Sequence, residues 1–422
     1  MERPFDMHSD TFDESSPNTP GTGPPDGGFK AWLQVALCHF VILNTWGYIN
    51  SFGIFQTYYK TFLGHSESDL SWIGSIQIFI LFFGGVFSGR LTDAGYFKPI
   101  FIFGVIFQLL GIFLTSICTK YYQIFLAQGV CIGIGNCLLF CPALTVISPY
   151  FSRHRSLAIA IAVSGSGTGG IIFPAIANSS LSILGFPWTI RILGLISTIT
   201  HIPCILFMKP RLLPRNTGPI LELQAFKEPP YTLFNIGMFL NFLGLYFTFF
   251  YLSSFAHHIL HASSSVSMTL LMILNSVGIL GRLIPSFLAD KYLGPLNTII
   301  HINFSTAIIM YSWTSVHSLG SLYAFTVVYG FFAAGVQSLF PAVVTHLTHD
   351  QGRIGTRMGM VFAIVGVACL VGLPLSGVLI GARHDGGFLY AQMASGTFLG
   401  VGAVFMVLAR VAKTGWVWMV KA

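Results

Sequence analysis

An arginine inside an apolar segment is the residue whose chemistry stands out first. Arg282 lies in the stretch 266–288, roughly 24 Å from its start at a helical rise of 1.5 Å per residue. A charged side chain at such a depth in a membrane costs from about 3 to more than 10 kcal/mol. Its guanidinium could fork onto a substrate carboxylate in a water-filled cavity. Alternatively, it snorkels to the membrane interface and neutralises Asp290.

Further polar and aromatic residues are spaced so that they could line the same cavity. His39, Trp46 and Asn50 follow one another at intervals of 7 and 4 residues, which places them on one helical face. We expect Trp46 and Asn50, together with Tyr246 and Asn275 from later segments, to contact substrate. His39 is the candidate proton site because imidazole titrates near neutrality, although a lone histidine in a span also serves as an ordinary packing residue.

Two carboxylates at the ends of apolar segments are candidates for a gate. Asp93 and Asp290 each end a segment on the side predicted to be cytoplasmic, and each faces a basic turn in the other half of the chain. The turns carry Arg353 and Arg357, or Arg153 and Arg155. A carboxylate also favours the positive N-terminus of the helix that follows such a turn. The alternative is that these charges only set the topology and have no partner.

The composition requires elements that hold these residues in lipid. The chain has 422 residues, of which 54% are hydrophobic and 8% are charged, whereas a soluble domain carries about 25% charged residues. The net charge of +7 is spread singly between apolar blocks, so nucleic acid is not an expected partner. These proportions indicate an all-α membrane protein whose other partner is the lipid bilayer.

We predict twelve transmembrane helices arranged as two six-helix bundles. The spans are 31–55, 70–91, 99–119, 122–147, 156–178, 187–208, 231–254, 266–288, 295–316, 320–346, 355–381 and 388–411. They give an acidic, disordered tail at 1–28, bundles at 29–208 and 231–412, a linker at 209–230 and a second tail at 413–422. Most of the 21 Lys and Arg residues fall on the side of the tails and linker, which predicts cytoplasmic termini.

The two halves repeat each other, as alternating-access carriers require. Gly89–Pro99 matches Pro285–Pro295, and the stretch from Arg153 matches the stretch from Gly352. The motif at Gly89, Leu91, Asp93 and Lys98 resembles the signature loop of the major facilitator superfamily, which implies that fold.

The stretches Asn44–Tyr59 and Ile354–Met360 resemble the fungal branch of the monocarboxylate transporter family. Three further features resemble that family as a whole. They are Pro25–Val35 (PDGGFKAWLQV), Tyr150–Ala158 (YFSRHRSLA) and Gly281-Arg282. The resemblance covers about residues 25–412 and implies that Arg282 is the family's intramembrane arginine. Animal members carry a proton-coupling lysine and aspartate where this chain has Asn50 and Gly278, so the resemblance does not extend to that pair.

The leading hypothesis is a secondary active transporter of a small, anionic organic acid, driven by a gradient. The alternatives are an exporter of a secondary metabolite, an uptake carrier for a vitamin-like compound, and a non-transporting nutrient sensor. We predict no enzyme activity, cofactor or metal. The glycines at 165, 167 and 170 spell G-x-G-x-x-G, but no strand precedes them, so no nucleotide is expected. The plasma membrane is the expected location, and the vacuolar membrane is the alternative.

Overall fold

The computed structural model describes residues 26–65, 67–212, 220–348, 350–382 and 387–416, and the described residues form helices with no strand. The predicted tails fall largely outside these ranges, at residues 1–25 and 417–422. The helices up to the linker are α1 (Phe29–Asn50), α2 (Phe52–Leu63), α3 (Glu67–Phe83), α4 (Gly85–Asp93), α5 (Phe97–Thr115), α6 (Tyr121–Ile124), η1 (Phe125–Cys131), α7 (Ile132–Ile147), η2 (Ser148–Tyr150), α8 (Arg155–Val163) and α9 (Gly165–Phe207). From the linker onward they are η3 (Leu223–Lys227), α10 (Pro229–Leu260), α11 (Ser264–Leu288), η4 (Ala289–Leu293), α12 (Pro295–Ser312), η5 (Trp313–Ser315), α13 (Leu319–Leu347), η6 (Gln351–Arg353), α14 (Ile354–Gly381) and α15 (Leu389–Thr414).

The helices account for the twelve predicted spans. Nine segments of the described residues are long and apolar enough to cross a membrane, and one of them, Arg155–Phe207, contains two predicted spans. The remaining two spans are α1 and α12, which carry more polar residues. Asn44 in α1 and Asn303 in α12 are fully buried, because a polar side chain in a membrane protein is satisfied inside the bundle.

Several spans are interrupted by a single small residue. Ser51 separates α1 from α2, Gly84 separates α3 from α4, and Ser164 separates α8 from α9. A loop was predicted at 179–186. The structure instead has two helices there, together labelled α9, that meet directly at Gly185, where φ is 74°. Glycine adopts this left-handed conformation without a steric penalty, so the chain reverses between two spans there.

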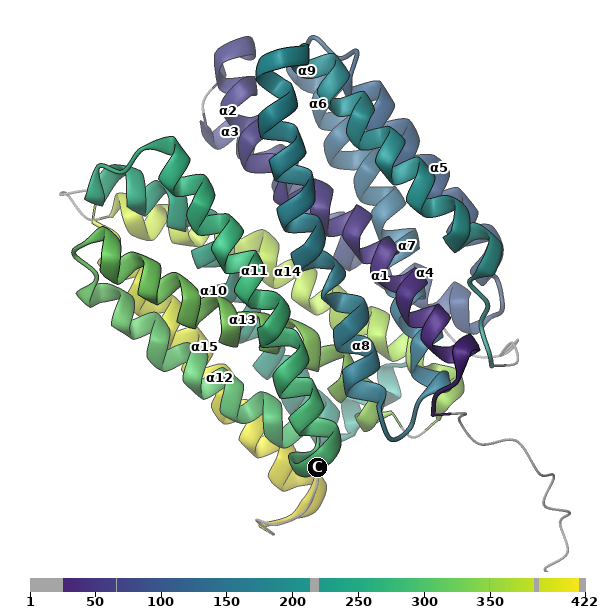
Figure 1. Cartoon of the computed structure of the whole chain (residues 1–422). Coiled ribbons are helices and arrows are strands. Elements are labelled where there is room, and N and C mark those ends of the chain that lie inside the picture. The colour runs from purple at the N-terminus through teal and green to yellow at the C-terminus, as the bar shows by residue number, and fades with distance from the viewer. Residues whose placement is uncertain (1–25, 66, 213–219, 349, 383–386, 417–422) are drawn as a thin grey trace, which may run out of the picture.

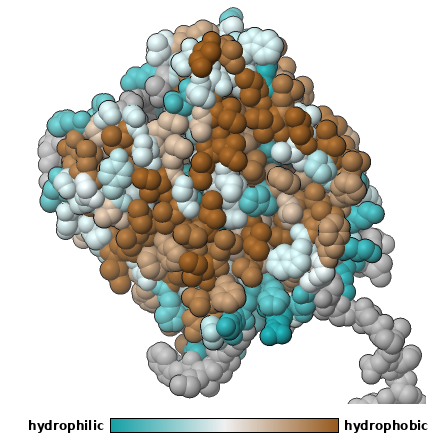
Figure 2. Space-filling view, in the orientation of Figure 1, coloured by the Kyte–Doolittle hydropathy of each residue, from teal (hydrophilic) through white to brown (hydrophobic). Residues whose placement is uncertain are grey.

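The helices gather into two groups, a first bundle of α1–α9 and a second bundle of α10–α15 (Figure 1). They touch where α3 and α4 pack on α14, and where α8 packs on α11 and α13. Asp93 and Asp290 lie at one end of the bundles, which we call the Asp93 end. Figure 2 shows an apolar band between hydrophilic edges on the displayed face, as expected for a surface that faces lipid.

Candidate functional site

Arg282 lies in a closed interface between the bundles. The residue is 2% exposed, and its Nη2 donates a hydrogen bond to the Gln337 side-chain oxygen at 3.0 Å. Its Nε and Nη1 atoms are buried and have no hydrogen-bond partner among the described residues. The expected water-filled cavity is therefore not seen around this side chain in this conformation, and the guanidinium binds Gln337 instead of snorkelling toward Asp290. Since buried charges are normally paired, two unpartnered nitrogens are an unusual feature.

Glycines make room for this guanidinium on both sides. A Cβ atom on Gly278 would lie 2.8 Å from Nη1 of Arg282, and one on Gly167 in the first bundle would lie 3.5 Å from it. Glycine at 278, the position where animal members of the resembled family carry an aspartate, leaves space that a side chain would fill. In the G-x-G-x-x-G stretch, Gly167 and Gly170 therefore serve close packing against the second bundle, whereas Gly165 packs against α1 of the first bundle.

Asn50 and Asn275 approach each other from opposite bundles, as predicted for residues of one site. A Cβ atom on Gly170 would lie 2.6 Å from Nδ2 of Asn50 and 2.7 Å from Oδ1 of Asn275. Asn50 donates to the Ser166 carbonyl oxygen at 3.2 Å, and Asn275 donates to the Leu271 carbonyl oxygen at 3.0 Å. Both amides thus rest on helix backbone beside Gly170.

Trp46 and Tyr246 also meet across the interface. Their ring centroids lie 6.1 Å apart with an interplanar angle of 7°, an offset stack of the kind that aromatic pairs favour. Other buried rings from both bundles extend this contact into an aromatic cluster, consisting of Trp46, Phe82, Phe140, Phe242, Tyr246, Phe340 and Phe362. The interface near Arg282 is therefore strongly aromatic.

His39 does not join the interface with Trp46 and Asn50, contrary to the prediction of a shared cavity face. Its Nδ1 lies 2.8 Å from the Ile161 carbonyl oxygen, so this nitrogen donates, and its Nε2 lies 3.0 Å from the Thr168 hydroxyl oxygen. Both contacts are within the first bundle. They match the alternative interpretation of His39 as a packing residue, because each ring nitrogen is already bonded.

At the Asp93 end, Asp93 and Asp290 each bind the start of a helix in the opposite bundle. Asp93 accepts hydrogen bonds from the backbone N–H groups of Gly355 at 3.0 Å and Thr356 at 2.7 Å, and from the Thr356 hydroxyl at 2.7 Å. Asp290 accepts from the N–H groups of Ser156 at 3.0 Å and Leu157 at 2.8 Å. The first N–H groups of a helix lack partners within it, and its positive end favours an anion.

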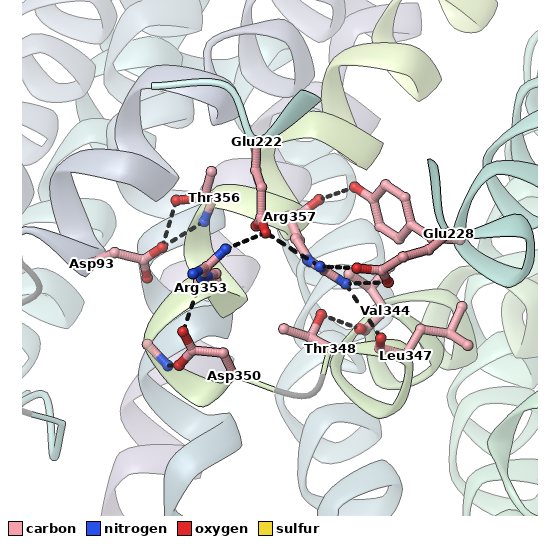
Figure 3. A network of polar contacts seen from close by, with 12 residues as sticks. Asp93, Glu222, Glu228, Val344, Leu347, Thr348, Asp350, Arg353, Thr356 and Arg357 are labelled. Carbon is pink, nitrogen blue, oxygen red and sulfur yellow. Dashed lines mark hydrogen bonds and ion pairs between the residues drawn. The ribbon is translucent and has the colours of Figure 1, made fainter. Parts of the chain in front are cut away.

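Arg353 and Arg357, at the turn before α14, pair with carboxylates other than the predicted Asp93. Arg357 pairs with Glu222 at 3.2 Å and with Glu228 at 2.5 Å, and Arg353 pairs with Glu222 at 2.5 Å. Figure 3 shows Glu222 between both arginines while Asp93 binds Thr356 beside them. The expected pairing of these arginines with Asp93 is thus replaced by pairing with the linker, because Asp93 reaches the helix backbone directly.

The basic turn of the first bundle is arranged differently. Arg155 donates from Nε to the Phe151 carbonyl oxygen at 2.9 Å. The N–H of Arg153 donates to Asp26 at 2.7 Å, and Ser152 donates to the same carboxylate oxygen. The hydrogen bonds of this turn therefore involve its own backbone and Asp26. From the sequence, Asp26 was predicted to lie in a disordered tail.

Glu222 is held as an anion by its surroundings. Its side chain is 6% exposed, and burial alone raises the pKa of this carboxyl. Hydrogen bonds from Arg357 and Arg353 and their positive charges outweigh burial, so the pKa lies below its ordinary value. From the sequence, Asp26 falls in the predicted tail, and Glu222 and Glu228 fall in the predicted linker. Their positions just before the first helix of each bundle were the available signal.

Comparisons with known proteins agree with this architecture. Residues 35–354 match the family model described as Major Facilitator Superfamily. The chain is 43% identical to an MFS-type transporter of Gibberella zeae over 92% of this chain and 88% of that protein. It is 36% identical to the aspyridones efflux protein of Emericella nidulans, over 93% of this chain and 80% of that protein.

The fold also matches solved structures. The crystal structure of the human organic anion transporter MFSD10 (TETRAN) aligns with a TM-score of 0.71 at 15% identity, covering 91% of this chain and 100% of that chain. At this identity the likeness concerns the fold alone. It agrees with the predicted two-bundle architecture.

Proposed function

Because the chain belongs to the major facilitator superfamily, in which the matched relatives are transporters, we propose that it exports an acidic, ring-containing secondary metabolite. A relative at 36% identity is named as an efflux protein for aspyridones, which favours the exporter hypothesis over uptake of a small acid. The finer assignment to the monocarboxylate branch rests on the sequence motifs alone.

Arg282 carries the proposal that the substrate is an anion. The guanidinium is 2% exposed and has two nitrogens without partners. An acid group that enters the opened interface would accept a hydrogen bond from Nη1 and neutralise the charge. If it also displaced the Gln337 oxygen from Nη2, it would make the bidentate contact with a planar guanidinium that suits a carboxylate or a similar anion. Asn50 and Asn275 would supply further polar contacts beside it.

The aromatic cluster supports a substrate with an apolar ring framework. Trp46 and Tyr246 stack on each other from opposite bundles, so separation of the bundles uncovers two ring faces at once. A flat apolar ring could replace that lost stacking contact, which contributes about 0.5–1.5 kcal/mol beyond burial for aromatic pairs. An acid of the size of lactate has no surface to make this contact.

We further propose that the Asp93 end faces the cytoplasm of a plasma-membrane protein and acts as a gate. The distribution of Lys and Arg supports this orientation. Asp93 and Asp290 would hold the bundles together at this end when the carrier opens outward, and release them when it opens inward. Such a pair of capped helices is a bistable contact of the type found in switching proteins.

Flux measurements in proteoliposomes test the proposed substrate class. We expect the wild type to carry 2-naphthoate faster than lactate, and to carry neutral 2-naphthylmethanol no faster than protein-free vesicles. Hydrogen bonds to a charged group contribute about 1.5–3 kcal/mol, and 1.4 kcal/mol is tenfold in binding, so Arg282→Gln should lower naphthoate flux roughly ten- to a hundredfold.

Arg191→Gln is the matched control. Arg191 lies at the opposite end of the bundle, where it stacks over Trp188 at 5.1 Å and donates to Ser116 at 3.4 Å. Its replacement should leave naphthoate flux within about twofold of wild type, as expected for a surface substitution. Full flux in a folded Arg282→Gln variant would remove the anion-binding role. If the wild type carried lactate faster than 2-naphthoate, the proposed ring-containing substrate would be wrong and a small acid would take its place.

A further inference from the structure

Each basic turn at the Asp93 end, with the helix that follows it, is bound by carboxylates from both bundles. The turn before α8 is bound by Asp26 through the N–H groups of Ser152 and Arg153, and α8 itself is capped by Asp290. Asp26 lies three residues before α1, in the same bundle as this turn. Asp290 belongs to the opposite bundle.

The turn before α14 has the same arrangement with different chemistry. Glu222 binds the side chains of Arg353 and Arg357, while Asp93 of the opposite bundle caps α14 at Gly355 and Thr356. Glu222 lies seven residues before α10, as Asp26 lies just before α1. The two halves therefore share a pattern. A carboxylate of the same half, Asp26 or Glu222, binds the basic turn, and a carboxylate of the other half, Asp290 or Asp93, caps the helix that follows.

We propose that Asp26 and Glu222 are positioning residues that stay bound to the basic turns throughout the transport cycle, whereas Asp93 and Asp290 bind these turns only while the Asp93 end is closed. This inference rests on the proposed alternating access. Asp26 and Glu222 would keep each helix start in place after the opposite bundle departs, ready to be capped again.

Electrostatics gives the reason why a contact within the same half is needed. The side chain of Arg357 is 6% exposed, and removing all partners from a buried charge is strongly destabilising. If Asp93 supplied the neutralising charge for Arg357, the arginine would lose its partner each time the Asp93 end opened. Glu222 and Glu228 travel with the second bundle and keep it paired in both conformations.

The linker is attached in a way that permits this motion. Its start is fixed to the first bundle, where Arg211 donates to the Pro149 carbonyl oxygen at 2.6 Å and the Tyr150 hydroxyl donates to the Lys209 carbonyl oxygen at 3.0 Å. Its end is fixed to the second bundle by Glu222. Residues 211 and 222 are eleven steps apart along the chain, a length that allows the two attached ends to separate by up to about 36 Å.

A pair of cross-links distinguishes the two kinds of contact. In a variant whose seven native cysteines are replaced, E222C/R353C joins the linker to its own turn, and D93C/T356C joins the two bundles. A short bifunctional methanethiosulfonate, which forms a reducible disulfide with each cysteine and releases methanesulfinate, is then applied to proteoliposomes, and 2-naphthoate flux is measured before and after. E222C/R353C should be slow before cross-linking, because it lacks the ion pair, and at least threefold faster afterward. D93C/T356C should lose its flux on cross-linking and regain it on reduction.

Hydrogen exchange of residues 85–93 gives a second result that needs no substrate. Cross-linked E222C/R353C should exchange as the cysteine-free parent does, whereas cross-linked D93C/T356C should be protected because the Asp93 end stays closed. If the parent carries no naphthoate, the proposed substrate fails while exchange still tests the inference. Loss of flux or protected exchange in cross-linked E222C/R353C would overturn it, as would parental flux before cross-linking.

Discussion

A buried guanidinium with two unpartnered nitrogens is the feature on which the proposed chemistry depends. The cost of an arginine within a span made Arg282 recognisable from the sequence alone. Its partner Gln337 and the glycine at 167 could not be assigned, because they are 55 and 115 residues away in sequence and depend on which helix faces meet. Glu222 was missed for a different reason, since a polar linker has no periodicity that marks one carboxylate.

Gln337→Glu tests the role of Arg282 at the scale of one residue. A carboxylate at this position would pair with the guanidinium, so we expect a higher melting temperature. Separating a buried ion pair costs about 3–5 kcal/mol, so a substrate anion that must displace it should bind roughly a hundredfold more weakly or worse. Thermal unfolding and naphthoate flux are the measurements. A stabilised variant with wild-type flux would assign Arg282 to structure alone.

Helices were largely predictable because each needs about 20 apolar residues to cross lipid. The predicted spans 320–346 and 355–381 correspond to α13 (Leu319–Leu347) and α14 (Ile354–Gly381). The prediction was wrong at 179–186, where the loop is part of the helical segment α9, because a single glycine at 185 suffices to reverse the chain. Packing between elements required the structure, since it depends on glycines that meet across the interface.

Close packing of α4 on α14 predicts the effect of one methyl group. A Cβ atom on Gly359 would overlap the carbonyl oxygen of Gly85, so Gly359→Ala should push the bundles apart at the Asp93 end. We expect at least twofold faster hydrogen exchange in residues 85–93. Alanine itself favours a helix by about 0.5–1 kcal/mol, so the change cannot arise from loss of helix propensity.

Gly381→Ala provides the control on the same helix, because no atom of the residues that the structure describes lies within 4 Å of a Cβ atom there. This variant should exchange as wild type does in residues 85–93. Unchanged exchange in Gly359→Ala as well would mean that α4 and α14 yield to the extra methyl group without separating the bundles.

At the scale of the whole molecule, two bundles meet through paired features drawn from each half. Internal repetition in the sequence predicted this plan, and the family match agrees with it. Asp93 caps α14 and Asp290 caps α8 across the interface. These contacts were predictable, because a carboxylate favours the positive N-terminus of a helix. The additional same-half contacts of Asp26 and Glu222 emerged only in three dimensions, because they join segments 126 and 131 residues apart.

Distances between spin labels at both ends of purified protein test the central claim most directly. One pair replaces the exposed Tyr96 and Tyr292 at the Asp93 end, and the other replaces Phe62 and His258 at the opposite end. On addition of 2-naphthoate, we predict that the distance lengthens at one end and shortens at the other, and that Arg282→Gln abolishes both changes. The account would be contradicted if neither distance changed on addition of 2-naphthoate, or if both changed equally in wild type and Arg282→Gln. Either result would exclude an anion carrier whose binding site depends on Arg282.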